Sequence, residues 1–569
     1  MMYTRMAMQF LKKHKFALLL AFVLIVAVLL RFPFLSVFPP SMLQDEVGIG
    51  YAAISIAETG MDEWGEKFPL IFKSFGDFKA PGFIYVTAVL YKLIGWQEVL
   101  PRITSAIAGV FVVLFGTLWI KKIFKSDELA LVAGLLLAAN PWTIHLSRMA
   151  LESNLGLAFF MAGLLFLSHA QNSYFKIILS AVFFSFSTYT FHSFRYAVIL
   201  FLLATIFVTL ILYFKEIKKK TLYLKSLIFI FVISTILSLP GFFAKGATGR
   251  LNQTLIITSD DYIKLSEHYE NNCHGTFIEI NPKLTILCKL KYNKFTRQAL
   301  IGVESLVKHF SPDFLFISGD TEVLRNPTQS GQFYVFLLPF WMIGSLLLFK
   351  NIKEQYPILL GYFVALVPST VSGNPHSTRL SILIPFVLVT LVLGYQFLKD
   401  YFRKVTYFSF TFLSILLVFL GLFVIRYSVD TFATHEITAT YLSYAKRVAM
   451  LEGEYLKKGY TVFADHDLYP EPHMYYAYFN KIDPRITQES FAKIYEESAG
   501  FSRPKQFGES LFFEKGDFFA LDCELNKIKP SVFFTNDALE KIEPITIIKD
   551  NTHLYSFVYV YEGSQKCLD

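Results

Sequence analysis

Residues 16–46 read FALLLAFVLIVAVLLRFPFLSVFPPSMLQDE, an apolar run followed closely by two adjacent carboxylates. The run from Phe16 to Leu35 has the length of about 20 residues that a helix needs to cross a bilayer. Its basic N-terminal flank is typical of a signal peptide, but no small-residue cleavage site follows it, so we expect a retained signal anchor. Asp45 and Glu46 then lie where the chain leaves the membrane.

The composition is that of a membrane protein. The chain has 569 residues, of which 54% are hydrophobic and 17% are charged. A soluble protein averages about 25% charged residues, so most of this chain is expected to face lipid. The net charge of +8 would suit nucleic acid, but Lys and Arg occur in short clusters between apolar runs, as orienting charges do. We therefore exclude a nucleic-acid partner.

Eleven apolar segments are predicted to cross the membrane. If the N-terminal sequence LKKHK is cytoplasmic, every dense Lys cluster between spans falls on the cytoplasmic side, as the positive-inside rule requires. The apolar segment 81–95 is too short for a span, and counting it would place the sequence KKIFK outside, so we expect an interfacial or re-entrant helix there. The predicted spans are 16–36, 102–120, 128–143, 153–169, 174–190, 196–213, 225–241, 332–349, 355–371, 377–397 and 405–426.

The expected fold class is a polytopic α-helical membrane protein with a small C-terminal α/β or α+β domain outside the cell. Residues 1–426 form the membrane domain, with large outer loops at 37–101 and 242–331. Residues 427–569 form the outer domain, which contains short β-like runs such as SVFFT and YSFVYVYE. All four cysteines fall outside in this topology, where disulfides persist. Simple pairing within each region gives Cys273–Cys288 and Cys523–Cys567, with four free thiols as the alternative.

The outer face carries the carboxylates that are candidates for chemistry. Asp45 and Glu46 open a predicted helix that ends at Gly60, where they either complement the helix dipole or mark a site, because carboxylates near a bilayer are costly. Asp77 and Lys79 precede the helix that starts at Pro81. Lys79 either reaches lipid headgroups or binds a phosphate. Arg102, at the head of the second span, has the same two interpretations.

Three short outer connections each combine a histidine with an arginine, against the positive-inside bias. One contains His145 and Arg148, followed by Glu152. The others contain the pairs His192 with Arg195 and His376 with Arg379. Each pair alone is an ordinary interfacial anchor, whereas together the cations indicate an anionic partner. A carboxylate base beside such cations suits transfer from a lipid phosphate to a hydroxyl.

Several segments resemble the GT-C superfamily of membrane glycosyltransferases, and in particular the group of protein O-mannosyltransferases and lipid A aminoarabinose transferases. The resemblance rests on RFPFLSVFPPSMLQDEVGIGYAA, on GDFKAPGFIYVTAVLYKLIGWQEVLPRITSAIAG, on HLSRMALESN, and on SPDFLFISGD and PHSTR further along the chain. It covers roughly residues 16–400. This chain departs from the family at two positions. The family has a proline where this chain has Ala80, and it more often has Asp where this chain has Glu152.

The resemblance implies an inverting sugar transfer from a polyprenyl-phosphate donor at the extracytoplasmic face. Asp45 is then the catalytic base, with Glu46 beside it and Glu152 as a second acidic residue. The acceptor is a protein, a lipid or a glycan, and neither a metal nor another cofactor is expected. The Asp-x-Asp at 465–467 is explained equally well by a polar loop. Implied phosphate-binding residues are Lys79, Arg102, Arg148, Arg195, His376 and Arg379, with Asp77 and His192 as further site residues.

Two other functions fit the same composition. A transporter or flippase of lipid-linked sugars would have internal repeats and polar or broken spans at the midplane, whereas the polar residues here gather at one face. A polymerase or ligase of surface polysaccharide would use a similar lipid-linked substrate.

Overall fold

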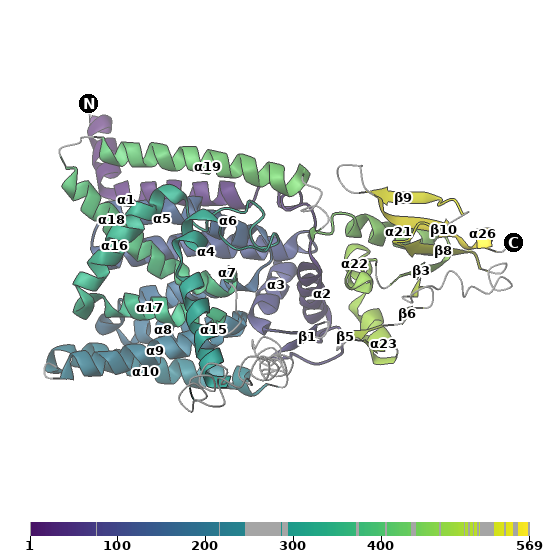
Figure 1. The fold of residues 1–569 in the computed structure, drawn as a ribbon, viewed down its shortest axis with the longest axis horizontal. Helices are drawn as coiled ribbons and strands as arrows, with labels where there is room; N and C mark the ends of the chain where they lie inside the picture. Colours follow the sequence, from purple (N-terminus) through teal and green to yellow (C-terminus); the bar gives the residue numbers. More distant parts are fainter. Residues whose placement is uncertain are drawn as a thin grey trace.

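A computed structural model gives the structure of the protein. It describes residues 2–74, 77–214, 217–244, 286, 294–370, 375–403, 407–433, 440–465, 468–493, 496–498, 501–504, 506–508, 511–512, 529–539, 542–549 and 556–566. A helical bundle occupies one end of the molecule and a mixed sheet the other (Figure 1). All four cysteines and residues 466–467 of the Asp-x-Asp lie outside the described residues, so the disulfide predictions stay predictions.

Each segment predicted to span the membrane contains at least one helix among the residues that the structure describes. The helices are α1 (Met2–Arg31), α4 (Leu100–Phe124), α5 (Asp127–Ala139), α6 (Pro141–Arg148), α7 (Glu152–Leu167), α8 (Tyr174–Thr190), α9 (His192–Leu212), α10 (Ile217–Phe243), α16 (Leu338–Lys350), α17 (Ile352–Thr370), α18 (Ile384–Tyr401) and α19 (Phe408–Ala433). Within the described residues, six helices are long and apolar enough to cross a bilayer. The number rises to seven if the bent pair α5 and α6 forms one span, so the predicted count of eleven is not confirmed.

The bend between α5 and α6 has a visible cause in the sequence. The two helices meet at 53°, and Pro141 is the first residue of α6. Proline lacks the N–H that would continue the α5 hydrogen bonds. The Asn140 side chain instead caps α6 by accepting a hydrogen bond of 2.9 Å from the Thr143 backbone.

Close helix contacts in the bundle depend on glycine. A Cβ added to Gly344 of α16 would lie 1.9 Å from the Thr390 carbonyl oxygen of α18. A Cβ added to Gly394 of α18 would lie 1.9 Å from the Phe340 carbonyl oxygen of α16. Small residues therefore let the two backbones touch, as in many membrane helix pairs.

Helices α2 (Gln44–Thr59) and α3 (Pro81–Ile94) lie at the end of the bundle that faces the C-terminal sheet (Figure 1). The short hairpin of β1 (Phe72–Ser74) and β2 (Asp77–Lys79) precedes α3. Helix α2 ends at Gly60, whose φ of 71° is the left-handed conformation that favours glycine. One face of α2 packs into the bundle core, and the opposite face packs against the C-terminal region.

The C-terminal region is a six-stranded sheet with helices beside it. The strand order is β6 (Gln506–Phe507), β7 (Leu511–Phe512), β3 (Thr461–Ala464), β8 (Ser531–Thr535), β10 (Ser556–Glu562) and β9 (Thr546–Lys549). β3 runs parallel to β7 and β8, whereas β10 is antiparallel to both of its neighbours. A separate hairpin joins β4 (Glu496–Ser498) and β5 (Phe501–Arg503). Further α-helices among the described residues are α15 (Lys294–His309), which precedes α16, and α21 (Ala445–Lys457), α22 (Pro472–Phe479), α23 (Pro484–Lys493) and α26 (Gly563–Lys566) in the C-terminal region.

Candidate active site

An exposed carboxylate and a buried ammonium meet at the start of α2. Asp45 lies in the first turn of α2, and its Oδ1 is 2.5 Å from the Nζ of Lys79. The Asp45 side chain is 61% exposed, whereas that of Lys79 is 4% exposed. Lys79 ends β2 and is paired in register with Phe72 of β1, so the hairpin sets its position. The Asp45 carboxylate is thus open to solvent, and the buried Lys79 ammonium balances its charge.

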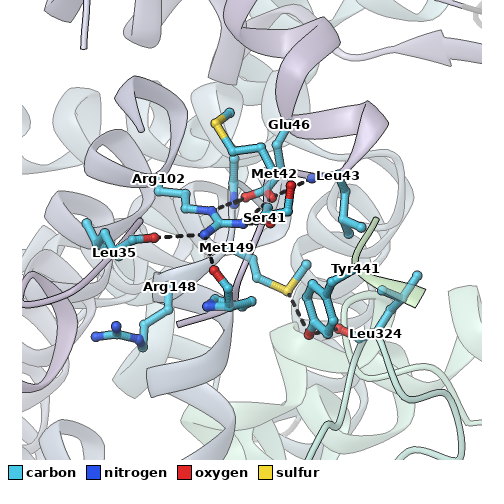
Figure 2. A network of polar contacts seen from close by, with 12 residues as sticks. Leu35, Ser41, Met42, Leu43, Glu46, Arg102, Arg148, Met149, Leu324 and Tyr441 are labelled. Atoms are coloured by element: carbon cyan, nitrogen blue, oxygen red, sulfur yellow. Dashed lines mark hydrogen bonds and ion pairs between the residues drawn. The ribbon is translucent and has the colours of Figure 1, made fainter. Parts of the chain in front are cut away.

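The neighbouring carboxylate, Glu46, is enclosed. Arg102 donates to both carboxylate oxygens of Glu46, from Nε to Oε1 at 2.8 Å and from Nη2 to Oε2 at 2.7 Å (Figure 2). Glu46 also accepts the backbone N–H groups of Leu43 at 2.9 Å and Ala150 at 2.8 Å. Glu46 therefore joins the start of α2 to α4 and to the turn before α7. Glu152, the first residue of α7, lies two positions beyond this junction and is half-buried.

Arg102 uses all of its hydrogen-bond donors within the protein. A guanidinium has five N–H groups, and two of those of Arg102 bind Glu46. The remaining three bind backbone carbonyl groups, those of Leu35, Pro39 and Ser41. A donor phosphate could reach Arg102 only by breaking this set. Arg102 is therefore better described as holding the segment that leads to Asp45 than as a phosphate ligand.

Arg148 is occupied in a similar way. It donates from Nε and both terminal nitrogens to carbonyl groups at the end of α1 and in the turn that follows, and it is almost fully buried. The last carbonyls of a helix have no partner within the helix, so a guanidinium satisfies them well. Its predicted phosphate contact thus has no free donor in this structure. The acceptors are the carbonyl groups of Leu30, Arg31, Pro33, Phe34 and Phe38.

Arg31 is a structural arginine that the sequence analysis missed. Its donors bind the Leu137 and Ala138 carbonyl groups at the end of α5 and the hydroxyls of Ser147 and Thr143 in α6. It therefore stabilises the bend between α5 and α6. A single arginine at the end of an apolar run is also the usual interfacial anchor, so the sequence held no signal for this role.

Arg195 differs from the other buried arginines. It is 1% exposed, and neither terminal nitrogen has a hydrogen-bond partner among the described residues. Its guanidinium lies 5.8 Å from the centre of the Phe242 ring. One turn earlier in α9, His192 Nε2 donates to the carbonyl oxygen of Phe78 at 2.8 Å. Phe78 is the residue before Lys79. The first turn of α9 is thus attached to the strand that carries Lys79, and Asp77 begins the same strand.

The segment with His376 and Arg379 is attached elsewhere. His376 Nδ1 lies 2.7 Å from the Thr378 hydroxyl, and Arg379 begins the short 3-10 helix that leads into α18. The Ser377 backbone N–H donates to Asp320 Oδ2 at 2.7 Å. Asp320 in turn pairs with Arg325 at 2.8 Å. These contacts connect the segment to residues 320–325 of the large outer loop.

Two acidic residues near Lys79 were also missed. Asp62 and Glu63 follow α2 and are both nearly inaccessible to solvent. Burial raises the pKa of Glu63 to about 8, and the charge of Lys79 opposes that rise. Burial also raises the pKa of Asp62 to about 6. The adjacent acidic pair at 62–63 was a visible signal, but its burial was not.

The described residues contain no group of three or more His, Cys, Asp or Glu side chains that could hold a metal ion. The expectation that no metal is needed stays a prediction. The polar contacts described above are instead between carboxylates, cations and backbone groups. They are suited to proton transfer and to binding an anion.

Comparison with known proteins identifies the fold. No protein-family model matches the chain, and no curated protein matches it. Among solved structures, ArnT from Cupriavidus metallidurans in the apo state aligns with a TM-score of 0.51, over 96% of this chain and 97% of that chain, at 12% sequence identity. ArnT is a GT-C protein. This chain has a GT-C fold.

Two further GT-C structures align at similar identity. ArnT bound to undecaprenyl phosphate gives a TM-score of 0.49, at 12% identity and over 96% of this chain and 97% of that chain. The oligosaccharyltransferase AglB from Archaeoglobus fulgidus, in complex with an inhibitory peptide and a dolichol-phosphate, gives 0.48 at 12% identity over 82% of this chain. The chain spans 64% of the length of AglB. At these identities the likeness concerns the fold alone.

Proposed function

We propose that this GT-C chain is a membrane glycosyltransferase that moves a sugar from a polyprenyl-phosphate donor to an acceptor hydroxyl, with inversion. The observation that carries the proposal is the exposed Asp45 carboxylate held 2.5 Å from the buried Lys79 ammonium. The fold supports the reaction class, and the ion pair supplies the groups that the reaction needs at one point.

Asp45 acts as the general base. Its exposed side chain takes the proton of the acceptor hydroxyl, and the hydroxyl oxygen attacks the anomeric carbon of the donor sugar. The bond from that carbon to the phosphate oxygen breaks, and the phosphate leaves with the electron pair. Attack opposite to the leaving group inverts the configuration at the anomeric carbon. Glu46 and Arg102 hold Asp45 in place without touching the substrates.

Lys79 and Arg195 receive the phosphate. Both cations are buried, and His192 attaches the first turn of α9, which carries Arg195, to the strand that carries Lys79. A phosphate that draws Lys79 away from Asp45 leaves the carboxylate a stronger base. The N-termini of α3 and α9 add favourable dipoles at the same place. Charge that develops on the leaving phosphate is thereby stabilised.

The reaction is proposed to occur on the extracytoplasmic face. The Lys-rich connections at 121–127, 215–225 and 399–404 are placed in the cytoplasm by the positive-inside rule. The connections that carry Lys79, Arg195 and Asp45 then lie on the other side. A donor anchored by a polyprenyl chain reaches this face without a nucleotide. Neither a nucleotide sugar nor a metal is part of the proposal.

The test uses purified protein in lipid nanodiscs with a panel of polyprenyl-phosphate sugars. Release of the polyprenyl phosphate is followed with and without a hydroxyl acceptor. We expect release from at least one donor, and a product whose anomeric configuration is opposite to that of the donor. Retention of configuration, or no release from any donor, would contradict the proposal.

A further inference from the structure

The connection from α1 to α2 leads to Asp45 without forming a helix or a strand, so its backbone carbonyl groups need partners from elsewhere. Arg148 and Arg102 of the bundle bind carbonyl groups within residues 33–41. The next carbonyl, that of Met42, lies three residues before Asp45. It is held by a side chain from the C-terminal region.

Tyr475 of α22 binds the Met42 carbonyl oxygen. The Tyr475 hydroxyl donates to this oxygen at 3.0 Å, and both side chains are buried. The Met42 side chain also packs in the same hydrophobic cluster as Tyr475 and Val47 of α2. Burial raises the pKa of Tyr475 well above its usual value, and the nearby charges of Glu46 and Asp45 add to the rise. The hydroxyl therefore stays protonated and can donate this hydrogen bond at neutral and mildly basic pH.

The C-terminal region contacts α2 along most of its length. Helix α22 lies beside α2 (Figure 1), and a Cβ added to Gly50 would lie only 2.7 Å from Cε2 of Tyr478. Near the other end of α2, the Gln488 amide of α23 donates to the hydroxyls of Ser55 and Thr59 at 3.1 and 3.0 Å. The helix that carries Asp45 is thus attached to the C-terminal region as well as to the bundle.

The two attachments meet on either side of Asp45. Glu46, the following residue, is fixed to the bundle by Arg102, and Met42 is fixed to α22 by Tyr475. The Asp45 side chain is 61% exposed, so its direction depends on its own backbone and on Lys79. The backbone at the start of α2 would be fixed from one side only if the Tyr475 hydroxyl were absent.

We infer that Tyr475 is a positioning residue for Asp45, and that the C-terminal region in this way completes the active site. Tyr475 acts through the Met42 backbone and does not touch the substrates. The effect on sugar transfer rests on the proposed function, whereas the fixing of the start of α2 does not.

Tyr475→Phe tests the inference because it removes only the hydroxyl. Its matched control is Tyr478→Phe in the same helix, where an equally buried hydroxyl donates at 3.0 Å to the Glu98 carbonyl before α4. In nanodiscs, we expect kcat for sugar transfer to fall roughly ten- to a hundredfold in Tyr475→Phe, since a displacement of about 1 Å has an effect of this size. Polyprenyl-phosphate affinity should be unchanged, and Tyr478→Phe should transfer at nearly the wild-type rate.

A double variant shows whether Tyr475 acts through Asp45. In the Asp45→Asn background, adding Tyr475→Phe should leave the residual transfer rate unchanged, because the group that it positions is already gone. A further tenfold fall in that background would mean that Tyr475 has a general structural role, and would overturn the inference. Equal transfer rates in Tyr475→Phe and Tyr478→Phe would overturn it too, while leaving the proposed function intact.

Hydrogen–deuterium exchange tests the structural part without any substrate. Peptides that cover residues 40–50 should exchange severalfold faster in Tyr475→Phe than in Tyr478→Phe. Met42→Ala, which removes the Met42 side chain from the C-terminal cluster, should give the same change if Tyr475→Phe does not fold. Unchanged exchange overturns the inference. If the wild type turns over no donor, the proposed function fails, and the exchange result still decides whether Tyr475 fixes the start of α2.

Discussion

Glu46 and Arg102 form a fully enclosed bidentate ion pair, and the next residue toward the N-terminus, Asp45, faces solvent. One residue of the Asp-Glu pair thus lies in the interior, while the other is exposed to solvent. The pair attaches the start of α2 to α4 and to the turn before α7. The position of Asp45 relative to Lys79 therefore depends on an interaction that takes no part in the proposed chemistry.

Breaking this pair should destabilise the protein. Removing one partner of a buried ion pair costs about 3–5 kcal/mol, because the other charge is left buried. We expect Arg102→Met and Glu46→Gln each to lower the midpoint of thermal unfolding in nanodiscs. The double variant Glu46→Met with Arg102→Met should recover part of the loss. Single variants as stable as the wild type would show that the pair does not hold α2.

Arg195 should contribute to binding of the carrier phosphate. A hydrogen bond to a charged group is worth about 1.5–3 kcal/mol, so Arg195→Met should weaken polyprenyl-phosphate binding by about ten- to a hundredfold. The matched control is Arg426→Met, at an exposed arginine of α19. Binding is measured by titrating polyprenyl phosphate into protein in nanodiscs. Equal affinity in both variants would place the phosphate elsewhere.

The stability of the C-terminal region should fall as the pH rises. Glu452 in α21 is buried, neither of its carboxylate oxygens has a hydrogen-bond partner among the described residues, and burial raises its pKa to about 8. An unfolded glutamate has a pKa of about 4.3. Between these values the folded chain binds more protons, so the free energy of unfolding falls by up to about 1.4 kcal/mol per pH unit.

Glu452→Gln removes this titration. We expect the variant to be more stable than the wild type at pH 8.5 and to differ little at pH 4, where the wild-type carboxyl is mostly protonated in both states. Thermal unfolding at several pH values measures the difference, with Glu454→Gln as the exposed neighbour for comparison. The same pH dependence in Glu452→Gln and wild type would mean that Glu452 does not titrate in this range.

The cysteines offer a test of topology. If the outer loop and the C-terminal region are extracytoplasmic, bridges Cys273–Cys288 and Cys523–Cys567 should form. Peptide mapping without reduction should recover two linked peptides, one from each region. Free thiols at all four positions would argue against an oxidising compartment for both regions.

The helices and the longer strands of the C-terminal sheet could be predicted from local pattern. Apolar runs specify helices wherever they occur, and the β-branched and aromatic runs at 531–535 and 556–562 form strands as expected. The bend at Pro141 was not predicted, although the proline was a visible cause. Hydropathy and charge predicted eleven membrane crossings, whereas the lengths and composition of the described helices support six or seven.

The site could be predicted only in part. Asp45 and Lys79 could be identified from the sequence as candidate site residues, because both are charged and lie next to apolar segments. The sequence could not show that the donors of Arg102 and Arg148 bind protein groups, because most of those partners are backbone carbonyl groups at the end of α1 and in the connection from α1 to α2. Backbone carbonyl groups are present in every residue, so the sequence does not indicate which of them will accept these hydrogen bonds.

The central claim is that Asp45 is the catalytic base, and Asp45→Asn tests it most directly. General base catalysis contributes about 10²–10⁴-fold, so acceptor-dependent polyprenyl-phosphate release should fall by at least about a hundredfold. Donor binding should be retained, because Lys79 and Arg195 remain in place. Acceptor-dependent release at the wild-type rate in folded Asp45→Asn protein would contradict the account.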